Sequence, residues 1–194
     1  MFVSWLVVAV VLTVLATSWV TFTATRLDRL HARVDAAQAA LDAQLVRRAA
    51  AVLHAADQAR DELGADVAAR MGGAAQRALS PGEVEREQAE NAVGKAANEL
   101  ADRQDTLAPT HRPALREVAD AADRVVIARR FYNDAVRDTR TLRRGRMPRL
   151  LRLAGHRAAP EFFDIDDSTR FPLARAAFAA RTEPTTAPDA GGTA

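Results

Sequence analysis

The chain has 194 residues, enough for one ordinary domain with appendages, and 48% of them are hydrophobic, enough to form a core. Alanine and arginine dominate, only 5% of the residues are aromatic and Lys95 is the single lysine, so the composition favours long helices over a sheet-rich fold. The absence of cysteine excludes disulfides and thiolate sites. The formal net charge of only +2 means that any strongly basic region is confined to one part of the chain.

The first 25 residues carry no charged side chain and predict a transmembrane anchor. About 20 apolar residues suffice for a helix to cross the hydrocarbon core of a membrane. Trp5, Trp19 and Phe22 lie near the ends of the run, where aromatic side chains prefer the interface with water. A cleaved signal peptide is the alternative, but residues 1–3 lack the positively charged region that it would need.

The orientation of the anchor follows from its flanks. Arg26, Arg29 and Arg33 follow the span, whereas no arginine or lysine precedes it. Because positive charge is retained in the cytoplasm, we expect the N-terminus outside and the bulk of the chain inside. The sequence therefore predicts a single-pass protein of the cytoplasmic membrane.

Downstream of the span, apolar residues recur at spacings of three and four and predict a long helix. An unbroken helix from Arg26 to Leu63 would be about 57 Å long at 1.5 Å per residue. Gly64 and the pair Gly72–Gly73 weaken helix propensity and predict a bend or a stop. The residues of the stripe are Leu27, Leu30, Val34, Ala37, Leu41, Leu45, Val52, Ala56, Ala59 and Leu63.

Two further helices are predicted. Ser80-Pro81-Gly82-Glu83 combines an N-cap serine, a proline at the first helical position and a glutamate for a capping box, so a helix should run from there to about Leu107. Residues 108–113 predict a turn, and another helix should continue to about Gly145. Its apolar stripe consists of Leu115, Val118, Ala122, Val125, Tyr132 and Val136.

The predicted fold class is all-α: an N-terminal transmembrane helix followed by an antiparallel bundle of three to four helices. Short connections make consecutive helices antiparallel neighbours, and a separate helix at residues 64–79 would supply the fourth. Residues 147–153 and 171–181 are expected to form short helical turns, and residues 182–194 a disordered tail. The expected domains are the anchor at 1–25, the bundle at 26–165, and a short helix with the tail at 166–194.

Two motifs resemble those of the LemA family. The stretch A-R-R-F-Y-N-D-A-V at 128–136, followed by G-H-R-A-A-P-E-F-F-D-I at 155–165, is similar to A-R-R-x-Y-N-x-A-V and a glycine-aromatic element leading to F-F. The stretch R-V-D-A-A-Q-A-A-L-D-A-Q-L-V-R-R at 33–48 is similar to R-V-x-x-A-W-x-x-I-D-V-Q-L-K-R-R. The resemblance covers roughly residues 27–165 and implies a membrane-anchored antiparallel bundle with no established enzymatic activity.

The chain departs from the family pattern at several positions. Gln38 stands where the family has tryptophan, and Val46 replaces a basic residue. The resemblance is therefore that of a diverged member. The motif positions that we expect to be structural are Asp42, Gln44, Arg47, Arg48, Arg129, Arg130, Tyr132, Asn133, Phe162 and Phe163.

Within the second motif, Phe131 and Tyr132 are both expected to fill core space that neighbouring alanines leave open. The Asn133 amide is expected to bond a neighbouring helix and fix its register. Asp42 is expected to form ion pairs with Arg47 and Arg48. A ligand site at these positions is the less favoured alternative.

The sequence offers no candidate active site. The four histidines lie on different elements without a helical pair, and the four serines lie in the span, at a helix cap and near the tail. No phosphate-binding glycine loop is present. We expect no catalytic activity, no cofactor and no metal ion.

One block of the sequence is strongly basic. Residues 137–157 carry eight arginines against one aspartate, a local charge of +7. The block is either a solvated helix end, where cations suit the helix dipole, or a site for anionic lipid headgroups. Nucleic acid is not expected as a partner, because aromatic residues for stacking are almost absent. The candidate lipid- or partner-binding residues are Arg143, Arg144, Arg146, Arg149 and Arg152.

These patterns predict a membrane-anchored scaffolding or interaction protein with an unidentified protein partner. Two alternatives stay open. One is a protein that binds anionic lipid headgroups and shapes or senses the membrane, and the other is an accessory subunit of a membrane hydrolase.

Overall fold

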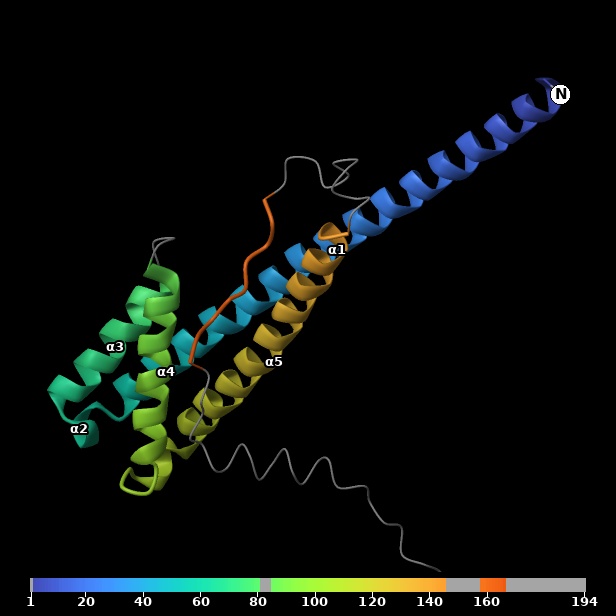
Figure 1. The fold of residues 1–194 in the computed structure, drawn as a ribbon. Coiled ribbons are helices and arrows are strands. Elements are labelled where there is room, and N and C mark those ends of the chain that lie inside the picture. The colour runs from blue at the N-terminus through green and yellow to red at the C-terminus, as the bar shows by residue number, and fades with distance from the viewer. Residues whose placement is uncertain (1, 81–84, 146–157, 167–194) are drawn as a thin grey trace, which may run out of the picture. The chain divides into compact units, whose positions relative to one another are not determined.

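The computed structural model describes residues 2–80, 85–145 and 158–166, and all the regular structure in these ranges is helical (Figure 1). The all-α prediction is confirmed. Residues 158–166 form an extended segment without regular structure. The helices are α1 at Phe2–Gln58, α2 at Arg60–Leu63, α3 at Ala65–Leu79, α4 at Arg86–Asp102, the 3-10 helix η2 at Pro109–His111 and α5 at Arg112–Arg143.

Helix α1 joins the apolar N-terminal run to the predicted amphipathic stripe without a break. Among the described helices, it is the one long and apolar enough to cross a membrane, judged by length and composition alone. Its N-terminal side chains are exposed, and Thr23 is the first buried residue that the structure describes. The hydroxyls of Thr13 and Thr17 donate to main-chain oxygens one turn earlier, so these polar groups are satisfied within the helix.

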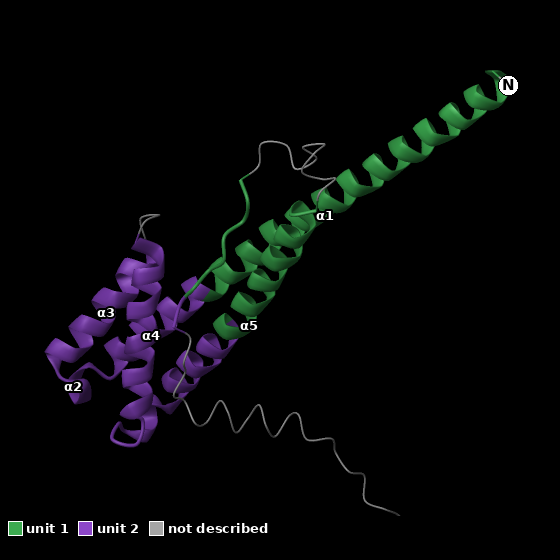
Figure 2. Ribbon diagram, viewed as in Figure 1, with its two compact units in different colours: residues 1–44, 125–164 green, residues 45–124, 165–194 purple. Residues whose placement is uncertain are grey.

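The chain divides into two compact units (Figure 2). Unit 1 comprises Met1–Gln44 and Val125–Asp164, and unit 2 comprises Leu45–Arg124 and Ile165–Ala194. Helices α1 and α5 each contribute to both units.

The core of unit 2 is built from alanines and short aliphatic side chains of α1 to α5. Val52, Val93 and Val118 have no exposed surface at all. Helices α3 and α4 pack against each other and run in opposite directions (Figure 1). The stripe predicted from Val52 to Leu63 is buried, which confirms it. Its small side chains let the helix backbones approach closely.

The sequence predicts a bend or a stop at two glycine positions, and a helix ends at the first of them only. Gly64 adopts a φ of +84° and separates α2 from α3, as expected of a residue without a Cβ. Gly72 and Gly73 instead lie inside α3. A Cβ on Gly72 would lie 3.4 Å from Cδ1 of Leu53, so close packing against α1 stabilises the helix there despite its low intrinsic propensity.

The predicted C-terminal limit of the next helix is also corrected. Helix α4 is described from Arg86 to Asp102, whereas the prediction extended from the Ser80 cap to Leu107. Ser80 directly follows α3, and residues 81–84 lie outside the described residues. After α4, the chain forms hydrogen-bonded turns up to Leu107. The helical turns expected at 147–153 and 171–181 and the tail at 182–194 also lie outside the described residues.

A single carboxylate holds the connection between α4 and α5 in unit 2. Glu62 Oε2 accepts a hydrogen bond from the Ala108 backbone N–H at 2.7 Å, and Oε1 lies 3.2 Å from Nε2 of His111. The hydrogen bond from Ala108 lowers the pKa of Glu62 from its ordinary value of 4.5. Desolvation acts in the opposite direction, and the contact with His111 lowers the pKa further. Ionised Glu62 therefore stabilises this turn.

Replacement of Glu62 by glutamine tests this connection. Because the folded-state pKa is lowered, the contribution of the carboxylate is present above pH 4.5 and is lost as the pH falls through the folded-state value. The variant should melt at a lower temperature than the wild type near neutral pH, and the difference should shrink below pH 4.5. Thermal melts followed by circular dichroism measure this. Asp61→Asn, an exposed carboxylate on the same helix, is the control and should show no such difference.

Candidate interaction site on unit 1

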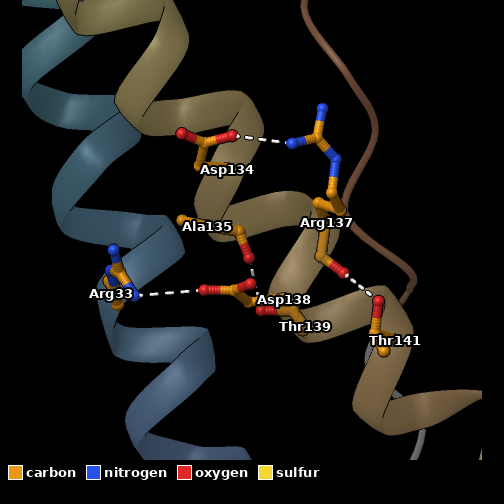
Figure 3. A network of polar contacts seen from close by, with 7 residues as sticks. All are labelled: Arg33, Asp134, Ala135, Arg137, Asp138, Thr139 and Thr141. Atoms are coloured by element: carbon orange, nitrogen blue, oxygen red, sulfur yellow. Dashed lines mark hydrogen bonds and ion pairs between the residues drawn. The ribbon is translucent and has the colours of Figure 1, made fainter.

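Unit 1 is organised by the pairing of α1 with the second half of α5. Arg33 of α1 forms an ion pair with Asp138 of α5, with Nη1 and Oδ2 3.2 Å apart (Figure 3). Farther along, His31 Nε2 lies 3.5 Å from Nη1 of Arg143. The contact partners move from Arg33 back to His31 on α1 as they move from Asp138 forward to Arg143 on α5. The two helices are therefore antiparallel (Figure 1).

The apolar side chains between these two helices follow the predicted stripes. Leu27, Val34 and Leu41 of α1 are buried, as are Val125 and Val136 of α5. These burials confirm the stripe positions assigned from the sequence in unit 1.

The polar contacts around this pairing lie mostly within α5 (Figure 3). Thr139 is fully buried, and its hydroxyl donates to the main-chain oxygen of Ala135 at 2.9 Å. Arg137 pairs with Asp134 three residues earlier. Of the residues drawn in Figure 3, Arg33 and Asp138 alone join the two helices, and both are more than half exposed, so this pair contributes about 0.2 to 1 kcal/mol.

Residues 158–164 form an extended segment of unit 1 beside α5, which we call the strap. Tyr132 is 8% exposed, and its hydroxyl donates to the main-chain oxygen of Glu161 at 2.8 Å. Burial raises the pKa of the Tyr132 phenol above its ordinary value, and the charges of Asp42 and Glu161 act in the same direction. The phenol therefore stays protonated and able to donate over a wide pH range.

Asn133 binds the strap through both ends of its amide. Nδ2 donates to the main-chain oxygen of Phe163 at 3.1 Å, and Oδ1 accepts from the Phe163 backbone N–H at 3.0 Å. We expected this amide to bond a neighbouring helix, so its partner is corrected to an extended segment of the chain. The side chain satisfies both main-chain groups of one residue, as a neighbouring strand would.

Three arginines of α5 complete the contacts with the strap. Arg143 Nη1 donates to the main-chain oxygen of Ala158 at 2.8 Å. The Arg140 guanidinium lies 5.1 Å from the centre of the Phe162 ring, within the range of a cation–π contact. Arg129 forms a looser ion pair with Asp164, at 3.8 Å. Five side chains of α5 thus form the strap site: Arg129, Tyr132, Asn133, Arg140 and Arg143.

The expectation that Phe131 belongs to the core is wrong. Its side chain is 63% exposed, and Ile127, one turn earlier, is 45% exposed. Successive residues of a helix lie about 100° apart, so Phe131 and Tyr132 project in different directions from α5. Tyr132 lies on the stripe of Val125 and Val136, and Phe131 is therefore on the outer face.

In unit 2, Arg48 is nearly completely buried. Its Nη2 donates to Glu90 Oε2 and to the main-chain oxygen of Glu90, both at 2.9 Å. We expected Asp42 as its partner, whereas the pair formed is with Glu90 on α4, 42 residues away. Arg48 Nε is buried without a hydrogen-bond partner. Glu90 could not be identified from the sequence, because nothing in its local pattern distinguishes it from an exposed glutamate.

The remaining motif residues occupy varied positions. Asp42 and Gln44 are half-buried, and Gln44 Oε1 has no hydrogen-bond partner. Arg47 and Arg130 are exposed. Phe163 is half-buried, whereas Phe162 is 43% exposed.

Past the strap, the chain contacts α4 within unit 2. The backbone N–H of Asp166 donates to Asn91 Oδ1 at 2.8 Å, and Ile165 is buried. A Cβ on Gly94 would lie 3.3 Å from the main-chain oxygen of Asp166, so the absence of a side chain allows this close approach.

Two of the five candidate lipid-binding arginines are described. Arg143 contacts His31 and the strap, and Arg144 is exposed at the end of α5. Arg146, Arg149 and Arg152 lie outside the described residues.

A shallow depression of about 320 Å³ lies between α1, α5 and the strap in unit 1. Its lining includes His31 and Asp35 of α1, Tyr132 of α5, and Ala158 and Ala159 of the strap. Within the described ranges, no three histidine, aspartate or glutamate side chains come together as a metal site.

No family model, curated protein or solved structure matches the chain.

Replacement of each neighbouring aromatic residue by alanine tests the assignment of Tyr132 and Phe131. Tyr132→Ala removes a buried ring and should lower the free energy of unfolding by roughly 3 to 5 kcal/mol. Phe131→Ala removes an exposed ring and should change it by less than about 0.5 kcal/mol. Denaturant melts of the full chain in detergent measure both. A larger loss for Phe131→Ala than for Tyr132→Ala would contradict the assignment.

Proposed function

We propose that the protein is a membrane-anchored scaffold of the LemA type, without catalytic activity of its own. The observation that carries this proposal is the continuity of α1, which runs from an exposed apolar segment into the helical body without a break. A rigid helix of this kind would hold an interaction module at a fixed place beside a membrane. The antiparallel pairs α1–α5 and α3–α4 support the bundle expected of the family.

The contacts of the motif residues support membership of the LemA family. Tyr132 and Asn133 bind the strap that carries the Phe162-Phe163 pair, so both parts of the C-terminal signature meet in one contact. Arg48, from the N-terminal motif, is buried against Glu90. The motif thus coincides with side chains that hold the chain together.

The proposed location is the cytoplasmic membrane, with a single pass, the N-terminus outside and the bulk of the chain in the cytoplasm. Arg26 and Arg29 are exposed on α1 directly after the apolar segment, where positive charge favours the cytoplasmic side. A partner protein bound there is the expected ligand of the scaffold.

Reporter fusions after Ala194 test this topology. A fluorescent reporter that matures in the cytoplasm should be active and should sediment with membranes, whereas an alkaline-phosphatase reporter, which requires export, should be inactive. Replacement of Arg26, Arg29 and Arg33 by glutamine should weaken this bias, because it removes the positive charge beside the span. An active phosphatase fusion of the wild type would contradict the proposed orientation, and recovery in the soluble fraction would contradict the anchor.

Binding of anionic lipid is a second candidate function. The antiparallel pairing in unit 1 returns the end of α5 to His31, six residues beyond the expected end of the span. Arg144, at this end of α5, is exposed, as are Arg26 and Arg29 on α1. These cations would lie near lipid phosphates if α1 crosses a membrane, and each would contribute on the order of 1 kcal/mol.

The preference of the full chain for anionic over neutral lipid, measured after reconstitution in vesicles, tests this second function. The variant for this test carries glutamine in place of Arg144, Arg146, Arg149 and Arg152, and it keeps Arg143 because that residue binds the strap. The variant should immobilise a smaller fraction of spin-labelled anionic lipid than the wild type, and high salt should reduce the fraction for the wild type. A control replaces four exposed arginines of unit 2, Arg60, Arg70, Arg77 and Arg112, by glutamine. Equal selectivity of wild type and variant would contradict the candidate function.

A further inference from the structure

The strap is held mainly through its main chain. Tyr132, Asn133 and Arg143 make four hydrogen bonds with main-chain atoms of the strap. Main-chain groups are common to all peptides, so these side chains recognise an extended conformation more than a particular sequence. Side-chain selectivity comes from Arg140 over the Phe162 ring and from Arg129 opposite Asp164.

The strap is also shallowly seated. Most of its side chains are exposed, and Pro160 and Phe163 are half-buried. A segment with little buried apolar surface opens locally at a small fraction of the free energy needed to unfold the whole chain. The strap site, in contrast, belongs to α5, whose stripe is buried against α1. Release of the strap therefore leaves the site intact.

The strap leaves space beside it. The depression of about 320 Å³ in unit 1 is lined on the strap side by residues 158–161, and the methyl groups of Ala158 and Ala159 do not fill it. His31 and Asp35 line the opposite side, on α1. A larger side chain at either alanine position would make contacts that the strap itself does not make.

We propose that the strap site is a binding site for an extended segment of a partner protein, and that residues 158–164 occupy it in cis. The fitting segment has an aromatic residue where Phe162 lies, a carboxylate where Asp164 lies, and residues larger than alanine at the positions of Ala158 and Ala159. The inference rests on the interaction role proposed above, since it names the kind of partner that the scaffold holds.

Competition between cis and partner segments sets the conditions for exchange. An intramolecular ligand commonly acts at an effective concentration on the order of 1 mM. A partner segment must therefore bind more tightly than the strap or be concentrated beside it. The strap thereby excludes weak peptide ligands from the site.

The test is binding of a labelled peptide with the strap sequence A-A-P-E-F-F-D to the full chain in detergent, followed by fluorescence anisotropy. Phe163→Pro removes the backbone N–H that donates a hydrogen bond to Asn133 Oδ1. The substitution should therefore release the strap while leaving the side chains of the site unchanged. The peptide should bind this variant about tenfold or more tightly than the wild type, because the cis competitor is weakened.

Two controls address the site itself. Addition of Asn133→Ala to Phe163→Pro should abolish binding, because the amide that bonds Phe163 is removed. A peptide with proline at the position of Phe163 should not bind either variant. Replacement of the first two alanines of the peptide by leucine should increase its affinity for Phe163→Pro, because the depression is then filled.

The proposal is overturned if a folded Phe163→Pro chain does not bind the peptide, or if the wild type binds it equally well. If Phe163→Pro loses helicity, Asp164→Arg serves instead, since it reverses the charge opposite Arg129. Loss of helicity in both variants would show that the fold requires the strap and would also overturn the proposal. The proposal would also be overturned if the wild type were a dimer and Phe163→Pro were a monomer, because the strap would then be bound by a second copy of the chain. The assay involves neither lipid nor topology, so its failure is distinct from failure of the membrane assignment.

Discussion

The two-ended contact between the Asn133 amide and the main chain of Phe163 joins the strap to α5 in unit 1. An asparagine can make this contact because its side chain carries a donor and an acceptor in the same plane as a peptide group. The neighbouring Tyr132 adds a bond from a buried position, so its ring packs between helices while its hydroxyl reaches the strap. The Tyr-Asn pair therefore connects the packing of two helices to the placement of an extended segment.

The core of unit 2 is packed largely through alanine side chains. Small side chains allow close helix contacts but bury little apolar area each, so many must be buried together. Within this core, the buried Arg48–Glu90 pair is an exception whose desolvation offsets much of its attraction. Its geometric consequence is specific: the guanidinium bonds both the carboxylate and the main chain of Glu90, which fixes α1 against α4.

The sequence predicted the features that depend on local pattern and missed those that depend on distant partners. The stripes of α1 and α5 follow helical periodicity, and Leu27, Val52 and Val125 are buried accordingly. The alanines around Phe131 predict a place for its ring in the core, but its position on α5 lies off the buried stripe of Val125, Tyr132 and Val136, and the ring is exposed. Neither the passage of α3 through Gly72 nor the strap partner of Asn133 is encoded in a nearby residue, because both arise from tertiary packing.

Hydrogen exchange at the Phe163 amide in the wild type and in Asn133→Ala tests the central claim most directly. The amide should be protected in the wild type, because its hydrogen is donated to Asn133 Oδ1. In the variant this protection should be lost, while amides on the buried stripe of α5 exchange as slowly as before. Unchanged protection of Phe163 in Asn133→Ala would contradict the account, because the strap would then be held by something other than this side chain.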